Sequence, residues 1–215
     1  MPIFHHSETG VPLYSSGAKL AASVATLAAL SALTLLHEAR VQGNVVLVDA
    51  DGSEWVWNET STLTSDSIFV LAPDDAPSAG RWLRKTGYVD LGLAFTYATA
   101  DATVLATLPT GSRFKVMGGY WEVTTGFTGG SSSAIGISST NSSGHTTKGD
   151  LLGGSGGDVA ATLVAGIQSG TIGADIAAGC MMVAADTIRF DRVTSAFTAG
   201  VGRAHLVGFL YNPGA

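Results

Sequence analysis

The longest stretch of the chain without Gly or Pro lies near the N-terminus and predicts a helix over residues 18–40. Ala and Leu dominate this stretch, and both residues favour helix. Leu20, Val24, Leu27 and Leu30 recur along it as an apolar stripe. Because charges are few and the 17 residues from Leu20 onward carry none, we expect a homo-oligomer that buries this helix or the flank of the C-terminal jelly roll.

A membrane span and a secretory signal peptide are the alternatives for the same run. The uncharged part has only 17 residues, of which four are Ser or Thr and six are Ala, so a membrane span is disfavoured. Lys19 is the only basic residue near its start, which disfavours a signal peptide. The sequence therefore predicts no membrane partner.

Residues 1–17 show neither a helical nor a strand period, and they contain two prolines and two glycines. Fully extended, 17 residues reach about 50–60 Å, enough to cross a neighbouring subunit. Apolar anchors stand at Phe4, Val11, Leu13 and Tyr14. We interpret this segment as an extended arm that attaches the protein to a particle, and a frayed terminus is the alternative.

Residues 41–87 have the pattern of a small β-rich module. An apolar run at 44–48, an Asp-Gly turn and a second run at 53–58 predict a hairpin that carries Trp55 and Trp57 on one face. Further strands are predicted at 68–72 and 81–84, with a turn over 73–80 between them.

Residues 88–215 show short strands separated by turns, which is typical of a β-sandwich or jelly roll. Gly118-Gly119 indicates a bulge within one strand, with a hairpin tip as the alternative. In the last strand both faces are largely apolar. The strands are expected at Tyr88–Ala98, Thr103–Leu108, Arg113–Thr125, Ser133–Ser139, Val159–Ser169, Gly179–Ala184, Thr187–Thr194 and Gly202–Asn212.

The composition favours a component of an assembly. Charged residues make up only 13% of the chain, its net charge is −6, and Ala, Gly, Ser and Thr account for 102 of the 215 residues. So few charges solvate a free surface poorly, whereas small uncharged residues suit burial between subunits. The scattered basic residues give no footprint for nucleic acid. The single Cys180 excludes an intramolecular disulfide framework and a cysteine-cluster zinc site.

No local motif points to catalysis, a cofactor or a metal, so we expect a protein that is not an enzyme. The G-x-S-x-G match at 153–157 lacks the strand and helix of an esterase elbow. None of His37, His145 and His205 has a carboxylate at a telling spacing. Asp49 and Asp51 fail the calcium-loop pattern and are explained by turn chemistry.

Three tryptophans within 28 residues, Trp55, Trp57 and Trp82, form either a platform for sugar rings or the core of the 41–87 module. A module this small needs large apolar side chains to fold. The core is the favoured interpretation, and the glycan platform is the alternative.

Several motifs resemble those of structural proteins of tailed bacteriophages. From Ala21 to Arg84, an Ala/Leu run is followed by VQGNVVLVDADGSEWVWNETST and by VLAPDDAPSAGRWLR. Downstream, LPTGSRFKVMGGYWEVTTGF, SSAIGI and TAGVGRAHLVGFLYNP are similar to the jelly-roll domain of phage head-decoration and fibre proteins. Together the matching parts cover most of residues 18–215. Gly118-Gly119 departs from the β-branched run that is usual at that point.

The resemblance implies a non-enzymatic virion protein, assembled in the host cytoplasm, that is a capsid decoration, cement or head-spike protein. Its expected partners are further copies of itself, in a trimer or another symmetric ring, and the major capsid protein or other virion proteins. The alternative function is a tail- or head-fibre module that recognises a host surface glycan. A polysaccharide hydrolase has no local support. The expected fold is mainly β: an N-terminal arm (1–17), one helix (18–40), a small β-rich module (41–87) and a C-terminal sandwich or jelly roll (88–215).

Overall fold

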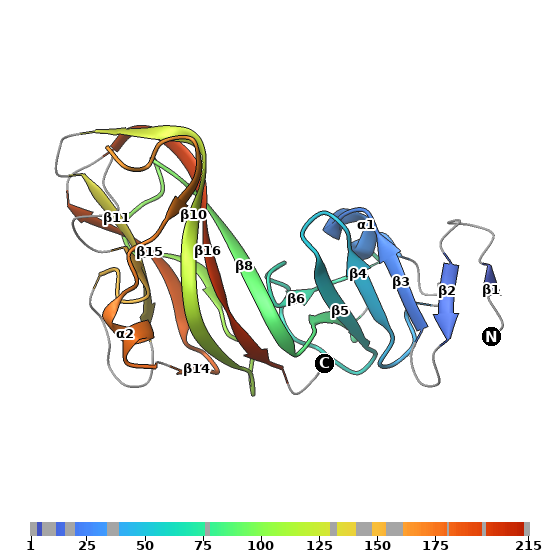
Figure 1. Ribbon diagram of the computed structural model, residues 1–215. Helices are drawn as coiled ribbons and strands as arrows, with labels where there is room; N and C mark the ends of the chain where they lie inside the picture. Colours follow the sequence, from blue (N-terminus) through green and yellow to red (C-terminus); the bar gives the residue numbers. More distant parts are fainter. Residues whose placement is uncertain are drawn as a thin grey trace. The chain divides into compact units, whose positions relative to one another are not determined.

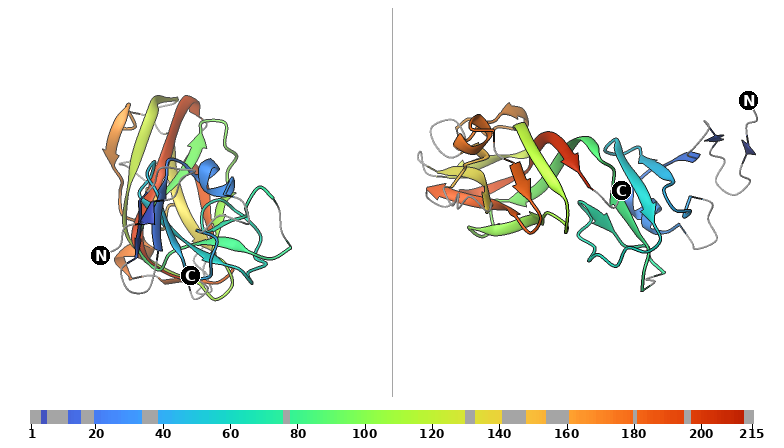
Figure 2. Two further views of the ribbon diagram at one scale, coloured as in Figure 1. Left: turned by 90° about the vertical axis from the view of Figure 1, so that its right-hand side faces the viewer. Right: turned by 90° about the horizontal axis from the view of Figure 1, so that it is seen from below.

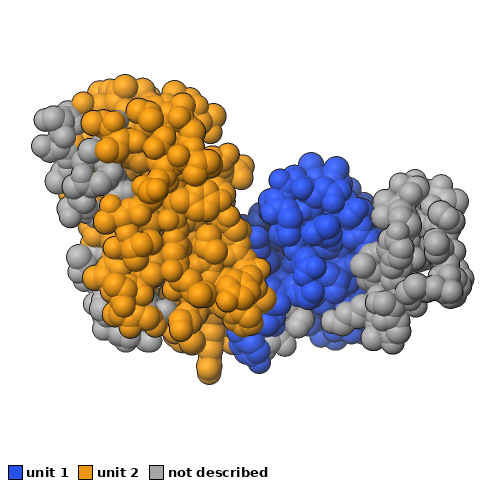
Figure 3. All heavy atoms as spheres, viewed as in Figure 1, with its two compact units in different colours: residues 1–86, 211–215 blue, residues 87–210 orange. Residues whose placement is uncertain are grey.

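The chain divides into two compact units, residues 1–86 with 211–215 and residues 87–210 (Figure 3). This boundary lies one residue from the one predicted between the β-rich module and the sandwich, but the last residues cluster with the first unit rather than the second. The computed structural model describes residues 4–5, 12–15, 20–33, 39–75, 78–129, 133–140, 148–153, 161–179, 181–194 and 197–212. The protein is mainly β, as predicted.

The first unit is built on one sheet with the strand order β1-β2-β3-β4-β5-β7-β6 in the described part (Figure 1). Gly52, with a φ of 68°, closes the predicted hairpin between β4 and β5. β5 and β7 begin and end where the sequence predicts them. The elements are β1 (Phe4–His5), β2 (Pro12–Ser15), β3 (Leu20–Val24), α1 (Leu27–Ser31), β4 (Val45–Val48), β5 (Ser53–Asn58), β6 (Val70–Leu71) and β7 (Arg81–Arg84).

The core of this unit is organised around tryptophans. Trp57 and Trp82 are paired across β5 and β7, with ring centroids 5.1 Å apart at 62°. The guanidinium of Arg40 lies 4.5 Å from the Trp57 ring. At Gly80, whose φ is +100°, a Cβ would lie 2.7 Å from Trp57 Cζ2, so only Gly fits there. The core cluster comprises Leu30, Ala39, Val46, Val48, Trp55, Trp57, Leu71 and Trp82.

The predicted helix over 18–40 is wrong for most of its described length. Leu20 and Val24 lie in β3, which pairs in parallel with the apolar β4, and only Leu27–Ser31 are helical. Leu27 and Leu30 therefore do not continue a stripe with Leu20 and Val24, and Leu30 is fully buried within the unit's own core. Pairing with β4, a contact distant in sequence, overrides the helix propensity of Ala and Leu. Residues 34–38 lie outside the described part.

The predicted irregular arm also contains strands. β1 pairs with β2, and β2 pairs with β3, both antiparallel, so Phe4, Leu13 and Tyr14 lie in the sheet. Main-chain hydrogen bonds are enough to add such short strands to the sheet. No alternation of apolar and polar side chains is therefore needed in the sequence. Val11 lies outside the described residues. Attachment through these four residues stays a prediction.

The second unit has two sheets, ordered β13-β10-β16-β8 with β14 also on β10, and β12-β11-β15-β9 (Figure 1). The long strands β10 and β16 run side by side (Figure 2). β12 and α2 were not predicted, and β16 begins five residues earlier than expected. The elements are β8 (Gly87–Thr96), β9 (Thr103–Thr107), β10 (Arg113–Gly129), β11 (Ala134–Thr140), β12 (Leu152–Gly153), β13 (Gly166–Ser169), α2 (Ala174–Ala177), β14 (Met181–Val183), β15 (Thr187–Thr194) and β16 (Phe197–Tyr211).

The two sheets pack against each other through aromatic rings. Phe95 on β8 stacks on Phe190 of β15 at 5.0 Å and contacts Trp121 on β10 at 5.6 Å. These rings are all buried, so the inner faces of both sheets form one core. The arrangement is a β-rich sandwich, and the jelly-roll connectivity stays a prediction.

β10 continues through Gly118-Gly119, so these glycines do not form a hairpin tip. Phe114 and Val116 are buried before them, whereas Trp121 and Val123 are buried after them. The buried positions thus change from even to odd numbers, which is the effect of one extra residue in a strand. The burial pattern agrees with the predicted bulge.

Candidate functional site

Four polar side chains meet on the outer face of the β13-β10-β16-β8 sheet. Nδ1 of His205 lies 2.7 Å from Oδ1 of Asp90, and Nε2 lies 3.1 Å from Oε2 of Glu122. The Tyr120 hydroxyl donates to Oδ2 of Asp90 at 2.7 Å. The rings of Tyr120 and His205 are nearly parallel, with centroids 4.4 Å apart. We call Asp90, Tyr120, Glu122 and His205 the His205 network.

The strand geometry explains why these residues meet. Alternation along β8 turns Leu91 and Leu93 into the core and Asp90 outward. His205 pairs with Gly92, where the missing side chain leaves room for the imidazole, because a Cβ would lie 3.1 Å from Cε1.

The bulge in β10 supplies the other half of the network. If β10 had no extra residue, the alternation that buries Phe114 and Val116 would continue along the strand. Tyr120 and Glu122 would then point into the core. With the extra residue, both side chains reach the outer face, where His205 lies. The bulge thus positions two of the four groups.

The surroundings of Tyr120 favour a hydrogen-bond donor. Burial, and then the hydrogen bond to Asp90, raises the pKa of Tyr120 to about 12, so the phenol remains a donor. Both nitrogens of His205 face carboxylate oxygens, so the ring is held between Asp90 and Glu122.

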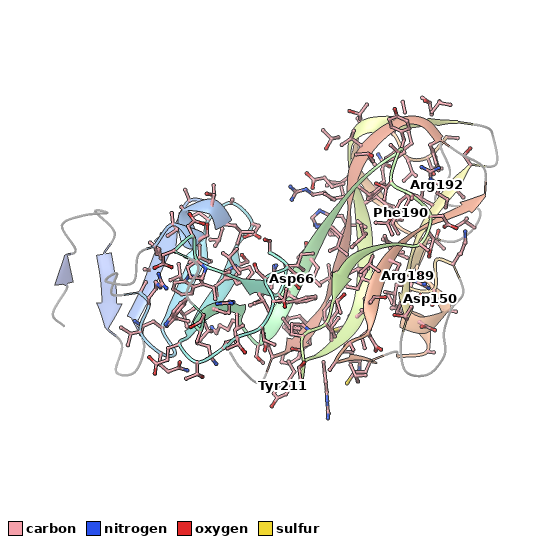
Figure 4. The ribbon with its side chains drawn as sticks, turned by 180° about the vertical axis from the view of Figure 1, so that it is seen from behind. Asp66, Asp150, Arg189, Phe190, Arg192 and Tyr211 are labelled. Atoms are coloured by element: carbon pink, nitrogen blue, oxygen red, sulfur yellow. The ribbon has the colours of Figure 1, made fainter. Side chains whose placement is uncertain are left out.

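A second polar cluster lies inside the same unit, where Asp150, Asp175 and Asp191 are all buried. Figure 4 labels Asp150 together with Arg189 of β15. Asp150 Oδ1 accepts from the Ser139 amide at 2.8 Å, and Asp175 Oδ2 accepts from the Ser139 hydroxyl at 3.3 Å. Asp191 Oδ2 accepts from the amide of Gly149 at 3.1 Å.

This cluster connects residues 148–153 and α2 to the sheet, since the amide of Asp175 also donates to the carbonyl of Asp150. Burial raises the pKa of Asp150 to about 7, and it raises the pKa of Asp191 as well. In the part of the chain that the structure describes, no group of three or more His, Cys, Asp or Glu side chains could hold a metal ion. We assign the cluster a structural role.

The predicted glycan platform is not supported. Trp55, Trp57 and Trp82 are at most 3% exposed, because each ring is packed into the core of the first unit. A sugar ring cannot stack on a face that the protein's own side chains cover. The favoured interpretation, a tryptophan core, agrees with the structure.

The other motifs carry no site. Asp51 Oδ1 accepts from the amide of Ser53 at 3.0 Å and from its hydroxyl at 2.6 Å, which is the expected turn chemistry. In the G-x-S-x-G match, Gly153 is the only described residue. His37, His145 and Cys180 lie outside the described residues.

Sequence reasoning missed the His205 network because its members lie up to 115 residues apart. Alternation along the strands places Asp90 and His205 on the side opposite the core. Nothing in the sequence indicates that β10 pairs with β16 in this register.

Within the described ranges, no helix is long and apolar enough to cross a membrane. Comparisons of the chain with protein-family models, with curated proteins and with solved structures find no match.

Proposed function

We propose that this chain is a non-enzymatic structural protein of a tailed-bacteriophage virion, specifically a capsid decoration, cement or head-spike protein. The observation that carries the proposal is the outer face of the sheet that contains β8 and β16, where exposed aromatic side chains stand beside polar ones. Leu91, Leu93 and Phe95 are buried on the inner face, whereas Tyr88 and Phe209 are exposed on the outer one. Antiparallel sheets of free-standing proteins usually have a polar solvent face.

The mechanism is mechanical. Association that removes apolar and small-residue surface from water lowers the free energy of the assembled shell. The low content of charge, 13% of residues, reduces the desolvation cost of such contacts.

Attachment is assigned to the N-terminal strands. In the described part of the first unit, β1 ends the sheet, so one side of this strand has no neighbouring strand. The unpaired backbone groups of an edge strand can bind a strand of another protein. A capsid protein that supplies such a strand is the expected partner.

The proposed function is tested by fractionating a lysate that contains phage particles. We expect the chain to co-purify with particles through a density gradient, in a fixed ratio to the capsid protein. Full-length chain that is found only among soluble proteins would refute a role in the virion.

Deleting residues 1–16 is expected to abolish attachment while both units stay folded. The deletion removes β1 and β2, but all members of the first unit's core cluster lie at Leu30 or later. The measurement is co-sedimentation of the truncated chain with particles that lack the protein, with circular dichroism to check folding. A folded truncated chain that binds as tightly as the full-length chain contradicts the assignment.

A further inference from the structure

Exposed apolar side chains gather on the outer face of the β13-β10-β16-β8 sheet. Tyr88 is 75% exposed, and its ring meets that of Phe209 edge-to-face at a centroid distance of 5.7 Å. The two residues are directly paired in the register of β8 and β16. Two adjoining exposed rings of this kind mark a candidate interaction surface. Further exposed apolar residues on these strands are Met117, Ile167, Val201 and Tyr211, and the polar His205 network lies among them.

The face is also accessible to another protein surface. On β8 the outward positions beyond Asp90 are the small residues Gly92 and Ala94, and the imidazole of His205 packs over Gly92. Against small residues a partner can pack closely, and aromatic rings beside them are the usual anchors of protein interfaces.

The charges on this face favour a second copy over other partners. The carboxylates of Asp90 and Glu122 are 42% and 46% exposed, and Lys115 and Arg203 are exposed on the same face. An acidic partner such as nucleic acid would be repelled by the carboxylates of Asp90 and Glu122. A strongly basic partner would be repelled by Lys115 and Arg203. A second copy brings charges of both signs and can pair each with its opposite.

The size of the face fits a dimer contact. Ten residue pairs join β8 to β16, which corresponds to about 34 Å along the strands. Three strands of this length spaced about 4.8 Å apart, with the four residues of β13 beside them, give about 550 Å² before the side-chain relief is counted. A stable interface buries about 800 Å² on each partner.

We infer that the outer face of β13, β10, β16 and β8, anchored by Tyr88 and Phe209, binds a second copy of this chain. The inference rests on the proposed function, because it names the surface through which the proposed oligomer forms. The His205 network then lies within the interface and orients Asp90 and Glu122 toward cations of the other copy.

The test uses the full chain and its Tyr88→Arg/Phe209→Arg double variant in sedimentation velocity at micromolar concentration. We expect an oligomer for the unmodified chain and at least about 30-fold weaker association for the variant. Val104→Arg is the matched control, because Val104 is 51% exposed but lies on β9 of the other sheet. This control should associate as the unmodified chain does.

Folding is checked separately by thermal unfolding. If the double variant does not fold, Met117→Arg on β10 introduces one charge at the same face and is expected to weaken association in the same way. An oligomer that both arginine variants leave intact overturns the inference, but not the proposed function. A monomeric unmodified chain also overturns the inference but not the proposed function, which the co-purification with particles tests separately. The unmodified chain could be monomeric while the arginine variants lose particle binding. In that case the face binds another virion protein, and the inference is again overturned.

Discussion

Replacing Trp57 by Ala is expected to destabilise the first unit by about 3–5 kcal/mol, the usual loss when a large core side chain is truncated. The ring contacts Trp82 and the guanidinium of Arg40, and it is 3% exposed. Collapse into the resulting cavity is restricted, because Gly80 already contacts the ring edge and holds a left-handed φ. The change should therefore remove a substantial part of the stability of a small unit.

The measurement is denaturant unfolding of the full chain, followed by circular dichroism and by tryptophan fluorescence. We expect the transition of the first unit to move to lower denaturant and that of the second unit to stay in place. Leu47→Ala is the matched control, since Leu47 lies on the same sheet but is exposed, and it should cost less than about 1 kcal/mol. An unaltered unfolding curve for Trp57→Ala would refute a tryptophan core.

Local signals were enough to predict much of the β structure. β5, β7 and β15 have the predicted bounds, and each begins directly after a residue that ends the preceding turn, namely Gly52, Gly80 or Asp186. The turn at Asp51 and Gly52 depends on two local features. The Asp51 carboxylate accepts a hydrogen bond from the Ser53 amide, and Gly52 adopts a positive φ.

Elements that depend on distant partners were not predictable in this way. Residues 20–24 have a composition typical of a helix, and only the neighbouring β4 makes them a strand. No local pattern indicates a role for Asp150, yet its carboxylate is buried against β11. For the same reason the His205 network, which depends on the pairing of three strands and on one bulge, could not be read from spacing.

The second unit is expected to be more stable at pH 5 than at pH 8, by about 2–3 kcal/mol. The cause is Asp150, whose pKa burial raises from 3.8 to about 7 in the folded protein. The folded state therefore binds this proton more tightly than the unfolded state does. The stabilisation is fully present below about pH 4 and is lost as the pH rises through about 7.

The groups that face Asp150 support this direction. Burial is the largest cause of the raised pKa of Asp150, and the hydrogen bond from the Ser139 amide opposes it. Asp175 on α2 and Asp191 on β15 raise this pKa further, whereas Arg189 on β15 lowers it. Burial raises the pKa of Asp191 too, which adds to the effect. Asp101 has a lowered pKa and acts in the opposite direction, but it is exposed and pairs with Lys148 at the surface, where such effects are small.

Asp150→Asn separates this carboxyl from the others, because the amide keeps an oxygen for the Ser139 amide but does not titrate. We expect the variant to retain only the smaller pH dependence that Asp191 contributes between pH 5 and 8, and to be more stable than the unmodified chain at pH 8. Asp49→Asn, in an exposed turn of the first unit, is the control and should leave the profile unchanged. If the unmodified chain is equally stable at pH 5 and pH 8, or if Asp150→Asn retains the full slope, Asp150 is not the group that links folding of this unit to pH.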